Sequence, residues 1–344
     1  MKKLFLDLEL PAIEQELVAG GFPAYRAKQL VEWVYRKRVR SFEDCPNIPA
    51  DMRQALDKKF VLRSLTLERK DSSALDGTVR YTFRTADKQT IYTVFLPSKQ
   101  RHSVCISTQV GCPIGCKFCA SGRVSFRRNL TRGEILEQII QAGEISGRAI
   151  TGVLLMGMGE PLLNYDNVIS ALRAMVDFRH LGLGRRHLIV STVGLVPAMR
   201  RFAEENIGVR LALSLHAPDD GVRRRFIPET VPHSIIDIVQ AGLYYSRTNN
   251  SRLTIEYVLV PEVNDTLECA KRFIKLLNHT TKPSDEVQVN LIPCNDTGER
   301  KWHTPTIEEI GRFKNYLEQN GILVTVRRPK GIDIGAACGQ LGVE

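Results

Sequence analysis

The spacing of apolar residues changes three times along the chain, and each change predicts a different kind of element. Positions 1–60 carry apolar residues at helical spacing, as in 24–38, where Leu30, Val31 and Val34 share one face. A Gly-Gly-Phe-Pro break at 20–23 and a proline at 49 separate three helical stretches. We therefore expect a small helical accessory domain over residues 1–60.

Residues 61–98 have the alternating pattern of strands. Positions 77–84 alternate polar and apolar residues, and 90–96 are rich in β-branched and aromatic residues, with a proline closing the run at 97. This pattern predicts a short pair of strands that links the helical domain to the rest of the chain.

From about residue 99 onward, apolar strands alternate with amphipathic helices. Strands are predicted at 103–107, 152–156, 187–191, 209–214, 254–260 and 287–292, and helices at 131–145, 168–178, 196–204, 235–246 and 267–277, with a last helix and strand over 307–326. Thr131 and Glu134 have the spacing of a capping box. Six strand–helix units predict an α/β fold with a parallel sheet, open or closed into a partial barrel, over residues 99–344. Functional groups in such folds gather at the carboxyl ends of the strands.

Composition narrows the class of protein. The 344 residues carry a formal net charge of +10, which favours a polyanionic partner, and no run of apolar residues is long enough to span a membrane. The first residues turn acidic too early for a secretory signal, so a cytoplasmic location is expected. Eight cysteines in such a chain indicate metal binding or redox chemistry rather than a disulfide framework.

Three of the cysteines, Cys112, Cys116 and Cys119, lie close together in a glycine-containing loop after the first predicted strand of the repeating region. A [4Fe–4S] cluster binds one cysteine per iron, so three thiolates leave one iron open to another ligand. A structural zinc site would need a fourth ligand, for which Cys105 and His102 are the nearest candidates. The spacing favours the iron–sulfur cluster and leaves zinc or a redox thiol as alternatives.

A CxxxCxxC loop after the first strand of a six-unit barrel resembles the radical S-adenosylmethionine (SAM) superfamily. This resemblance implies that the open iron binds the amino and carboxylate groups of SAM, and that the reduced cluster cleaves SAM to a 5′-deoxyadenosyl radical. One cluster per chain is expected, together with an electron donor such as flavodoxin or ferredoxin.

Further segments narrow the resemblance to one family. In chain order they are Ser107-Thr-Gln-Val-Gly-Cys112, Cys119-Ala-Ser-Gly122, Arg128-Asn-Leu-Thr-Arg-Gly-Glu-Ile135, Met156-Gly-Met-Gly-Glu-Pro161, Ser191-Thr-Val-Gly194, Leu213-Ser-Leu-His-Ala-Pro218 and Ala336-Ala-Cys-Gly-Gln-Leu341. Together they closely resemble the adenine-C2 methyltransferases of 23S rRNA and tRNA and their C8-methylating resistance relatives. The likeness covers nearly the whole chain, and it implies a monomeric RNA-modifying enzyme.

The resemblance implies a role for each matching position. Cys112, Cys116 and Cys119 would hold the cluster. The SAM pocket would be formed by Gly159, Glu160, Ser191, Ser214, Leu215, His216 and Asn295. Read without the family, Ser191 or His216 would more often be a core or capping residue.

The resemblance also makes Cys338 and Cys105 a catalytic pair. Cys338 would take a methyl group from one SAM, and the radical from a second SAM would activate that methyl group for addition to an adenine ring carbon. Cys105 would then release the RNA as a disulfide forms with Cys338, so each turnover would use two SAM molecules. Transfer through a methylated cysteine is chemically reasonable because adenine C2 is not nucleophilic and cannot take a methyl group from SAM directly, whereas a thiolate can.

Four groups of basic residues in the chain are predicted to bind RNA. Arginine groups at 123–132, 185–186, 223–225 and 327–330 are predicted to contact RNA phosphates around the mouth of the site.

Tyr92 stands where the family commonly has a glutamate that accepts a proton, and a tyrosine could only hydrogen-bond or stack on the base. The family resemblance makes methylation at adenine C2 the leading prediction in spite of this difference. The alternatives are C8 methylation, a paralogue with another RNA substrate, and a non-catalytic RNA- or ribosome-binding factor with a structural cluster.

Overall fold

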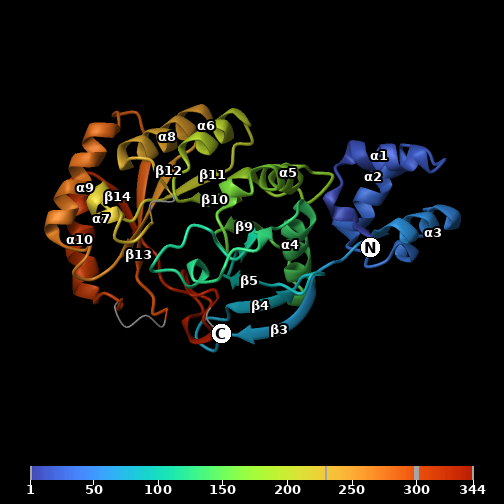
Figure 1. Cartoon of the computed structure of the whole chain (residues 1–344), viewed down its shortest axis with the longest axis horizontal. Coiled ribbons are helices and arrows are strands. Elements are labelled where there is room, and N and C mark those ends of the chain that lie inside the picture. The colour runs from blue at the N-terminus through green and yellow to red at the C-terminus, as the bar shows by residue number, and fades with distance from the viewer. Residues whose placement is uncertain (1, 229–230, 298–301, 343–344) are drawn as a thin grey trace.

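The computed structural model describes residues 2–228, 231–297 and 302–342. Its N-terminal part is helical, as expected. The elements are β1 (Lys3–Leu4), η1 (Phe5–Asp7), α1 (Leu10–Ala19), α2 (Arg26–Val31), the π-helical η2 (Glu32–Lys37), η3 (Phe42–Asp44), α3 (Ala50–Lys59) and β2 (Phe60–Val61). In Figure 1 helices α1, α2 and α3 form a cluster at one end of the molecule, beside the larger sheet.

The remaining elements alternate as the sequence predicts. The strands are β3 (Thr66–Ser72), β4 (Val79–Arg84), β5 (Thr90–Pro97), β6 (His102–Cys105), β7 (Gln109–Val110), β8 (Arg128–Asn129), β9 (Gly152–Leu155), β10 (Leu188–Thr192), β11 (Arg210–Ser214), β12 (Leu253–Leu259), β13 (Val287–Pro293) and β14 (Leu323–Val326). The helices are η4 (Ala120–Gly122), α4 (Arg132–Ser146), η5 (Pro161–Leu163), α5 (Tyr165–Val176), η6 (Arg185–His187), α6 (Val196–Glu204), α7 (Asp220–Arg223), α8 (Ile235–Thr248), α9 (Leu267–Thr280), α10 (Ile307–Gln319) and η7 (Ile332–Ile334).

One ten-stranded sheet organises the molecule, in the order β14-β13-β12-β11-β10-β9-β6-β5-β4-β3. All neighbours from β6 to β14 pair in parallel, because a helix returns the chain after each strand. Helices α4, α5, α6, α8, α9 and α10 cover the outer side of this curved sheet (Figure 1). The predicted α/β partial barrel of six strand–helix units is confirmed, and so is the capping box of α4 at Thr131 and Glu134.

The strand pair predicted before the barrel is present, but it continues the same sheet. Strands β4 and β5 pair antiparallel, β5 pairs antiparallel with β6, and a third strand, β3, lies on the outer edge. The sequence prediction missed β3 because this strand is mostly exposed and carries charged residues in place of an apolar alternation. The division of the chain at residues 60 and 98 stays a prediction.

Polar contacts fasten the N-terminal helices to α4. The guanidinium of Arg132 donates to the carbonyls of Leu6 and Leu8 and to the hydroxyl of Tyr35, and the carboxylate of Asp7 accepts from the amide of Gly133. The start of α4 thus carries the connection to the accessory helices. Within the described parts of the chain, no helix combines the length and apolar character needed to cross a membrane.

Candidate active site

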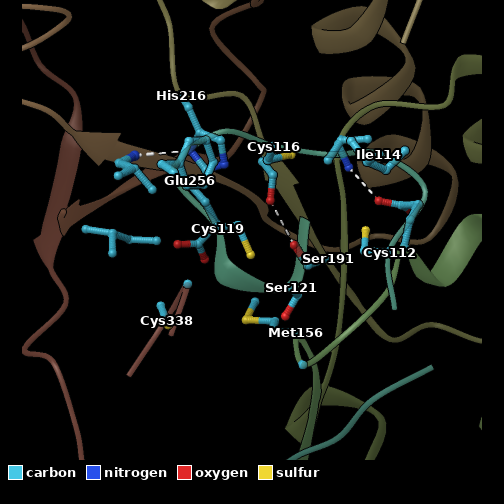
Figure 2. A pocket seen from close by; sticks show the side chains of 18 of the residues that line it. Cys112, Ile114, Cys116, Cys119, Ser121, Met156, Ser191, His216, Glu256 and Cys338 are labelled. Atoms are coloured by element: carbon cyan, nitrogen blue, oxygen red, sulfur yellow. Dashed lines mark hydrogen bonds between the residues drawn. The ribbon is translucent and has the colours of Figure 1, made fainter. Parts of the chain in front are cut away.

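A cavity of about 160 Å³ opens at the carboxyl ends of the parallel strands. Its lining comes from the cysteine loop after β7, from the ends of β9 to β14 and from the C-terminal segment around Cys338. Figure 2 shows Cys112, Cys116 and Cys119 around this space, together with Ser191, His216, Glu256 and Cys338. The strand ends are where an α/β fold gathers functional groups, so the location agrees with the sequence prediction.

The cysteine loop is held in a tight curve that brings its three thiols to the cavity. Gly111 has φ +74°, and a Cβ built on it would lie 2.3 Å from the carbonyl oxygen of Ser125, so no larger residue fits there. The amide of Cys119 donates to the carbonyl of Cys116 at 3.1 Å, and η4 begins at the next residue.

The surroundings of these thiols suit a positively charged metal cluster. Burial, with smaller contributions from Cys119 and Glu160, raises the pKa of Cys112 to about 11, and burial also raises the pKa values of Cys116 and Cys119. Three thiolates would not gather in this apolar space without a compensating cation, and a bound iron–sulfur core supplies one.

The arrangement of donors differs from that of a single-ion site. Among the residues that the structure describes, no three His, Cys, Asp or Glu side chains converge as ligands of one metal ion must. A four-iron cluster places each thiolate on a different iron, so its ligands need not converge on one point. The three cysteines therefore fit the [4Fe–4S] cluster that their spacing predicts.

Glu160 is a buried carboxylate in the lining of the cavity. Its two oxygens accept from the amides of Leu162 at 3.1 Å and Val193 at 2.9 Å. Burial nevertheless raises the pKa of Glu160 to about 7. An ammonium group entering the cavity would stabilise the ionised form, as a SAM amino group would.

The residue before it, Gly159, also lines the cavity with a conformation that favours glycine. Its φ is +102°, and a Cβ would lie 2.6 Å from the Cβ of Gln109. The side-chain oxygen of Gln109 accepts from the amide of Glu160 at 2.8 Å. The close approach of Gly159 to Gln109, together with this hydrogen bond, therefore fixes the backbone position of Glu160.

Two serines and a histidine continue the lining along β10 and β11. The hydroxyls of Ser191 and Ser214 are 3.0 Å apart, which suits recognition of a diol or another hydroxyl-bearing group. His216 accepts from the amide of Val258 through Nδ1 at 3.1 Å, and burial lowers its pKa to about 3. His216 is thus a neutral imidazole whose other nitrogen is the donor.

The other two residues predicted for the SAM pocket differ in their positions. Leu215 is fully buried and lies outside the cavity lining, so its side chain belongs to the core. Asn295 lines the cavity and donates from its side-chain amide to the carbonyl of Cys338 at 2.9 Å. Asn295 therefore positions the C-terminal segment as well as facing the cavity.

Cys338 lines both the main cavity and a second one of about 70 Å³. The second cavity is lined by Cys105, Cys119 and Arg327 among others, so the structure brings Cys105 and Cys338 to one space. Both cysteines are free, and burial together with the nearby Cys338 raises the pKa of Cys105 to about 12.

The C-terminal segment around Cys338 is anchored to the cysteine loop. The carbonyl of Gly339 accepts from the amide of Ala120 at 2.7 Å, and the hydroxyl of Ser121 donates to the carbonyl of Leu341 at 2.6 Å. Since both donors belong to η4, the cysteine loop itself holds Cys338 beside the cavity.

Tyr92 lies beneath this segment rather than in either cavity. Its side chain is buried in a cluster with Met158 and Ala336, and the guanidinium of Arg80 lies 5.8 Å from the ring centroid. In this structure the aromatic ring packs against the C-terminal segment through Ala336 and Leu341.

Two charged residues of the cavity were missed by the sequence prediction. Glu256 lies in β12, and its carboxylate accepts from the amide of Asn290 at 2.7 Å. Arg327, predicted from the sequence only as an RNA contact at the mouth of the site, lines both cavities. A single acidic residue within the apolar run 254–260 was the signal that could have identified Glu256.

Several arginines predicted to contact RNA have structural roles instead. Arg128 binds the carboxylates of Asp87 and Glu134, while Arg132 and Arg223 are buried and donate to backbone carbonyls. Residues 185–186 precede β10, at the amino end of the strand and away from the mouth. The structure does not favour RNA contact at these positions, because Arg128, Arg132 and Arg223 already have intramolecular acceptors and residues 185–186 lie at the amino end of a strand.

Comparison with known proteins gives consistent results. The family model of the Radical SAM superfamily matches residues 106–276, and that of the ribosomal RNA large subunit methyltransferase N-terminal domain matches residues 4–62. A protein of Endomicrobium trichonymphae called "Probable dual-specificity RNA methyltransferase RlmN" is 47% identical, over 99% of this chain and 97% of its own. A protein of Thermotoga maritima with the same name is 41% identical, over 99% of this chain and 97% of its own.

A solved structure agrees over the whole length. The crystal structure of a radical SAM methyltransferase from Sphaerobacter thermophilus superposes with a TM-score of 0.93 at 38% identity, covering 99% of this chain and 100% of that one. Membership of the Radical SAM superfamily implies a [4Fe–4S] cluster and SAM as cofactors. Full-length identity, both family models and the matching fold show that this chain belongs to the RlmN family of dual-specificity RNA methyltransferases, within the Radical SAM superfamily.

Proposed function

We propose that this protein methylates C2 of adenine in 23S rRNA and tRNA through a methylated Cys338. The observation that carries the proposal is that Cys338 lines both cavities. The main cavity is lined by the three cluster cysteines and by most of the residues assigned to SAM, and the second, which shares Cys119 and Asn295 with it, is lined by Cys105. A residue that carries a carbon unit from SAM to a base must face both compartments.

The residues of the main cavity bind and orient the cofactors in this proposal. Cys112, Cys116 and Cys119 hold the cluster, which supplies the one-electron chemistry that cleaves SAM. Glu160 binds the SAM amino group, and the Ser191–Ser214 pair binds its ribose hydroxyls, which is consistent with the hydrogen-bonding groups at these positions.

Cys338 and Cys105 then divide the transfer to RNA between them. The Cys338 thiolate attacks the methyl carbon of one SAM, forming a sulfur–carbon bond and releasing S-adenosylhomocysteine. The radical derived from a second SAM then takes a hydrogen atom from this methyl group, and the resulting carbon radical adds to the adenine ring carbon, which loses its own hydrogen as a proton while one electron would return to the cluster. The Cys105 thiolate attacks the Cys338 sulfur, so a disulfide forms as the bond between this sulfur and the transferred carbon breaks, and the electron pair of that bond takes up a proton to complete the methyl group. The high pKa of Cys105 means that it must lose its proton during the reaction rather than before it.

Ribosomal and transfer RNA as substrates place the reaction in the cytoplasm. The electron would come from a donor such as flavodoxin or ferredoxin, and one chain holds every residue that the proposal uses, so a monomer suffices. Two SAM molecules are consumed per methyl group, one as methyl donor and one as radical source.

The position of methylation is tested by nucleoside mass spectrometry. RNA from cells lacking the gene is compared with RNA from cells carrying the wild type or Cys338→Ala, against standards of 2-methyladenosine and 8-methyladenosine. We expect 2-methyladenosine in 23S rRNA and tRNA only with the wild type. An unchanged set of methyladenosines would overturn the proposal, and the 8-methyl nucleoside alone would reassign the ring position.

The division of labour between the cysteines gives a separate prediction. Cys105→Ala should accumulate an RNA–protein crosslink through Cys338, because the adduct forms and cannot be released. Denaturing gel electrophoresis with labelled RNA measures it. Cys45→Ala, which removes a buried thiol of the N-terminal helices, is the matched control and should release product normally. Free methylated RNA at the normal rate from Cys105→Ala would exclude Cys105 from the release step.

A further inference from the structure

A buried carboxylate in the lining of the main cavity has no role in the proposed mechanism. Glu256 lies in β12, is 5% exposed, and lines the cavity together with Ser191 and Ser214. One of its carboxylate oxygens accepts from the side-chain amide of Asn290 at 2.7 Å. Over residues 2–228, 231–297 and 302–342, no other group donates to this carboxylate. A carboxylate removed from bulk water needs hydrogen-bond donors, and a ligand in the cavity can supply one to the second oxygen.

The side chain that holds Glu256 is itself fixed in its orientation. The side-chain oxygen of Asn290 accepts from the hydroxyl of Thr325 at 3.1 Å, and that hydroxyl accepts from the side-chain amide of Gln288 at 3.0 Å. All three hydrogen bonds of this chain donate in the direction of Glu256. Because Thr325 occupies the amide oxygen of Asn290, the amide nitrogen is the atom that faces the carboxylate. Glu256 is therefore held as an acceptor, with one oxygen bound and the other left to a ligand.

The sheet register places Glu256 in one row with the serine pair of the cavity. Ser214 in β11 is the direct neighbour of Glu256, and Glu256 is the direct neighbour of Asn290 in β13. Side chains at paired positions of neighbouring strands point to the same face of the sheet. The hydroxyl of Ser214 in turn lies 3.0 Å from that of Ser191. Two hydroxyls and a carboxylate therefore follow one another along the lining of the cavity, where Figure 2 shows Ser191 and Glu256.

A ribose diol matches the donors and acceptors of this row. Each ribose hydroxyl donates one hydrogen bond, so it needs an acceptor, and the two serines already share one of their hydroxyl hydrogens. A carboxylate accepts strongly from hydroxyl groups, as it does from the ribose in dinucleotide sites. We propose that Glu256 accepts from the ribose hydroxyls of SAM and is a specificity-determining residue that selects a ribonucleoside ligand. The proposal rests on the assignment of the serine pair to ribose, but not on the RNA or the ring position methylated.

The competing explanations are that Glu256 only holds Asn290 in the sheet, or that it serves the RNA step alone. Arg327, a cation of the same cavity, donates to the sulfur of Met156 at 3.5 Å and forms no ion pair with Glu256 in the described chain. Glu256→Gln keeps the shape of the side chain. Since the amide nitrogen of Asn290 retains the glutamine oxygen, the glutamine NH₂ group offers the ligand a donor in place of an acceptor. Glu286→Gln is the matched control, because the Glu286 side chain is 70% exposed.

The experiment is a calorimetric titration of the reconstituted full-length protein, with its cluster oxidised and without RNA. The ligands are SAM and two SAM analogues that lack the 2′ or the 3′ hydroxyl of the ribose. The wild type should bind at least one analogue about tenfold more weakly than SAM, as expected for loss of a hydrogen bond to a charged group. Glu256→Gln should bind SAM about tenfold more weakly than the wild type, and should prefer SAM to that analogue by less than about threefold. Glu286→Gln should match the wild type within about twofold.

The outcomes separate these roles. A wild type that binds both analogues as tightly as SAM overturns the proposal, whatever the variants do, and so does Glu256→Gln with unchanged affinity and preference. If Glu256→Gln does not fold, Thr325→Val decides at an exposed position: it frees the Asn290 amide to turn, and the preference for the ribose hydroxyl should fall at least about threefold. An unchanged preference in Thr325→Val would then overturn the proposal. Ribose preference in a protein that methylates no RNA would refute the proposed function and leave this inference intact.

Discussion

At the residue scale, burial sets the protonation of the groups around the cavity. His216 is neutral because burial lowers its pKa to about 3, and Glu160 is half-protonated near neutrality because burial raises its pKa to about 7. The histidine therefore contributes a hydrogen-bond donor at any physiological pH, whereas the charge of the glutamate depends on the ligand and the pH.

The shifted pKa of Glu160 predicts how SAM affinity depends on pH. A cationic amino group selects the carboxylate form, so below about pH 7 binding must expel a proton, and affinity should fall by up to about tenfold per pH unit. Calorimetric titration of the reconstituted protein from about pH 8 down to about pH 5.5 measures this. Glu160→Gln should bind more weakly and keep only the titration of the ligand's own amino group. An identical slope in the glutamine variant would contradict the assignment.

Backbone conformation at Gly159 gives a second prediction at this scale. Gly159→Ala adds a Cβ at φ +102° that would lie 2.6 Å from Gln109, so the turn before Glu160 must move. We expect a loss of about 2 kcal/mol or more in unfolding free energy, together with weaker SAM binding. Gly311→Ala is the control: it lies within α10 with open space around it, and should stabilise the protein by about 0.5–1 kcal/mol. Urea denaturation compares them, and equal stabilities would refute the strain argument.

At the scale of elements, the β3–β4 hairpin and the cysteine loop hold the C-terminal segment in place. The turn between β3 and β4 supplies Asp76, whose carboxylate accepts from the amide of Gly331 at 3.0 Å, and Asp333 of the segment accepts from the amide of Ala74 at 3.0 Å. Together with η4 on the other side, these contacts fix Cys338 in the lining of both cavities. The strands before the barrel thus contribute to the site although none of their side chains is assigned to the chemistry.

Helix α4 has an equally specific role, as the attachment point of the N-terminal helices. Arg132→Gln should lower the unfolding free energy by about 2–4 kcal/mol, because the buried carbonyls of Leu6 and Leu8 lose their donor. Arg127→Gln, at an exposed position, should change it by less than about 0.5 kcal/mol. Chemical denaturation measures both. If the two variants are equally stable, the Arg132 contacts do not join the two parts of the molecule.

At the scale of the whole molecule, net charge predicts how RNA binding responds to salt. Among the arginines and lysines predicted to contact RNA, exposed cations without an intramolecular acceptor in the described chain remain near the strand ends at positions 127, 224, 225 and 328. Four phosphate contacts predict that RNA affinity falls about 50- to 150-fold between about 50 and about 200 mM KCl. Fluorescence anisotropy with an RNA stem-loop measures the slope, which Arg224→Gln should reduce by about one contact and Arg128→Gln should not. A salt-independent affinity would exclude a phosphate-based interface.

Much of the molecule could be predicted because its signals are local. The strand and helix periods gave the barrel, the cysteine spacing gave the cluster loop, and Thr131 with Glu134 gave the start of α4. Where signals were not local, the prediction failed: β3 lacks an apolar alternation, and Arg128 looked like a surface arginine because its acceptor Asp87 is distant in sequence.

The sequence by itself thus determined the order of elements, the fold class and the residue types of the site, because periodicity, turn chemistry and motif spacing are properties of short segments. Only the tertiary structure decided which of these residues meet. It brought Cys338 to the lining of two cavities, packed Tyr92 against the C-terminal segment, and buried Arg223 against the carbonyls of Leu215 and Val193. The physical reason is that burial, hydrogen-bond partners and electrostatic neighbours are set by packing between segments far apart in the chain.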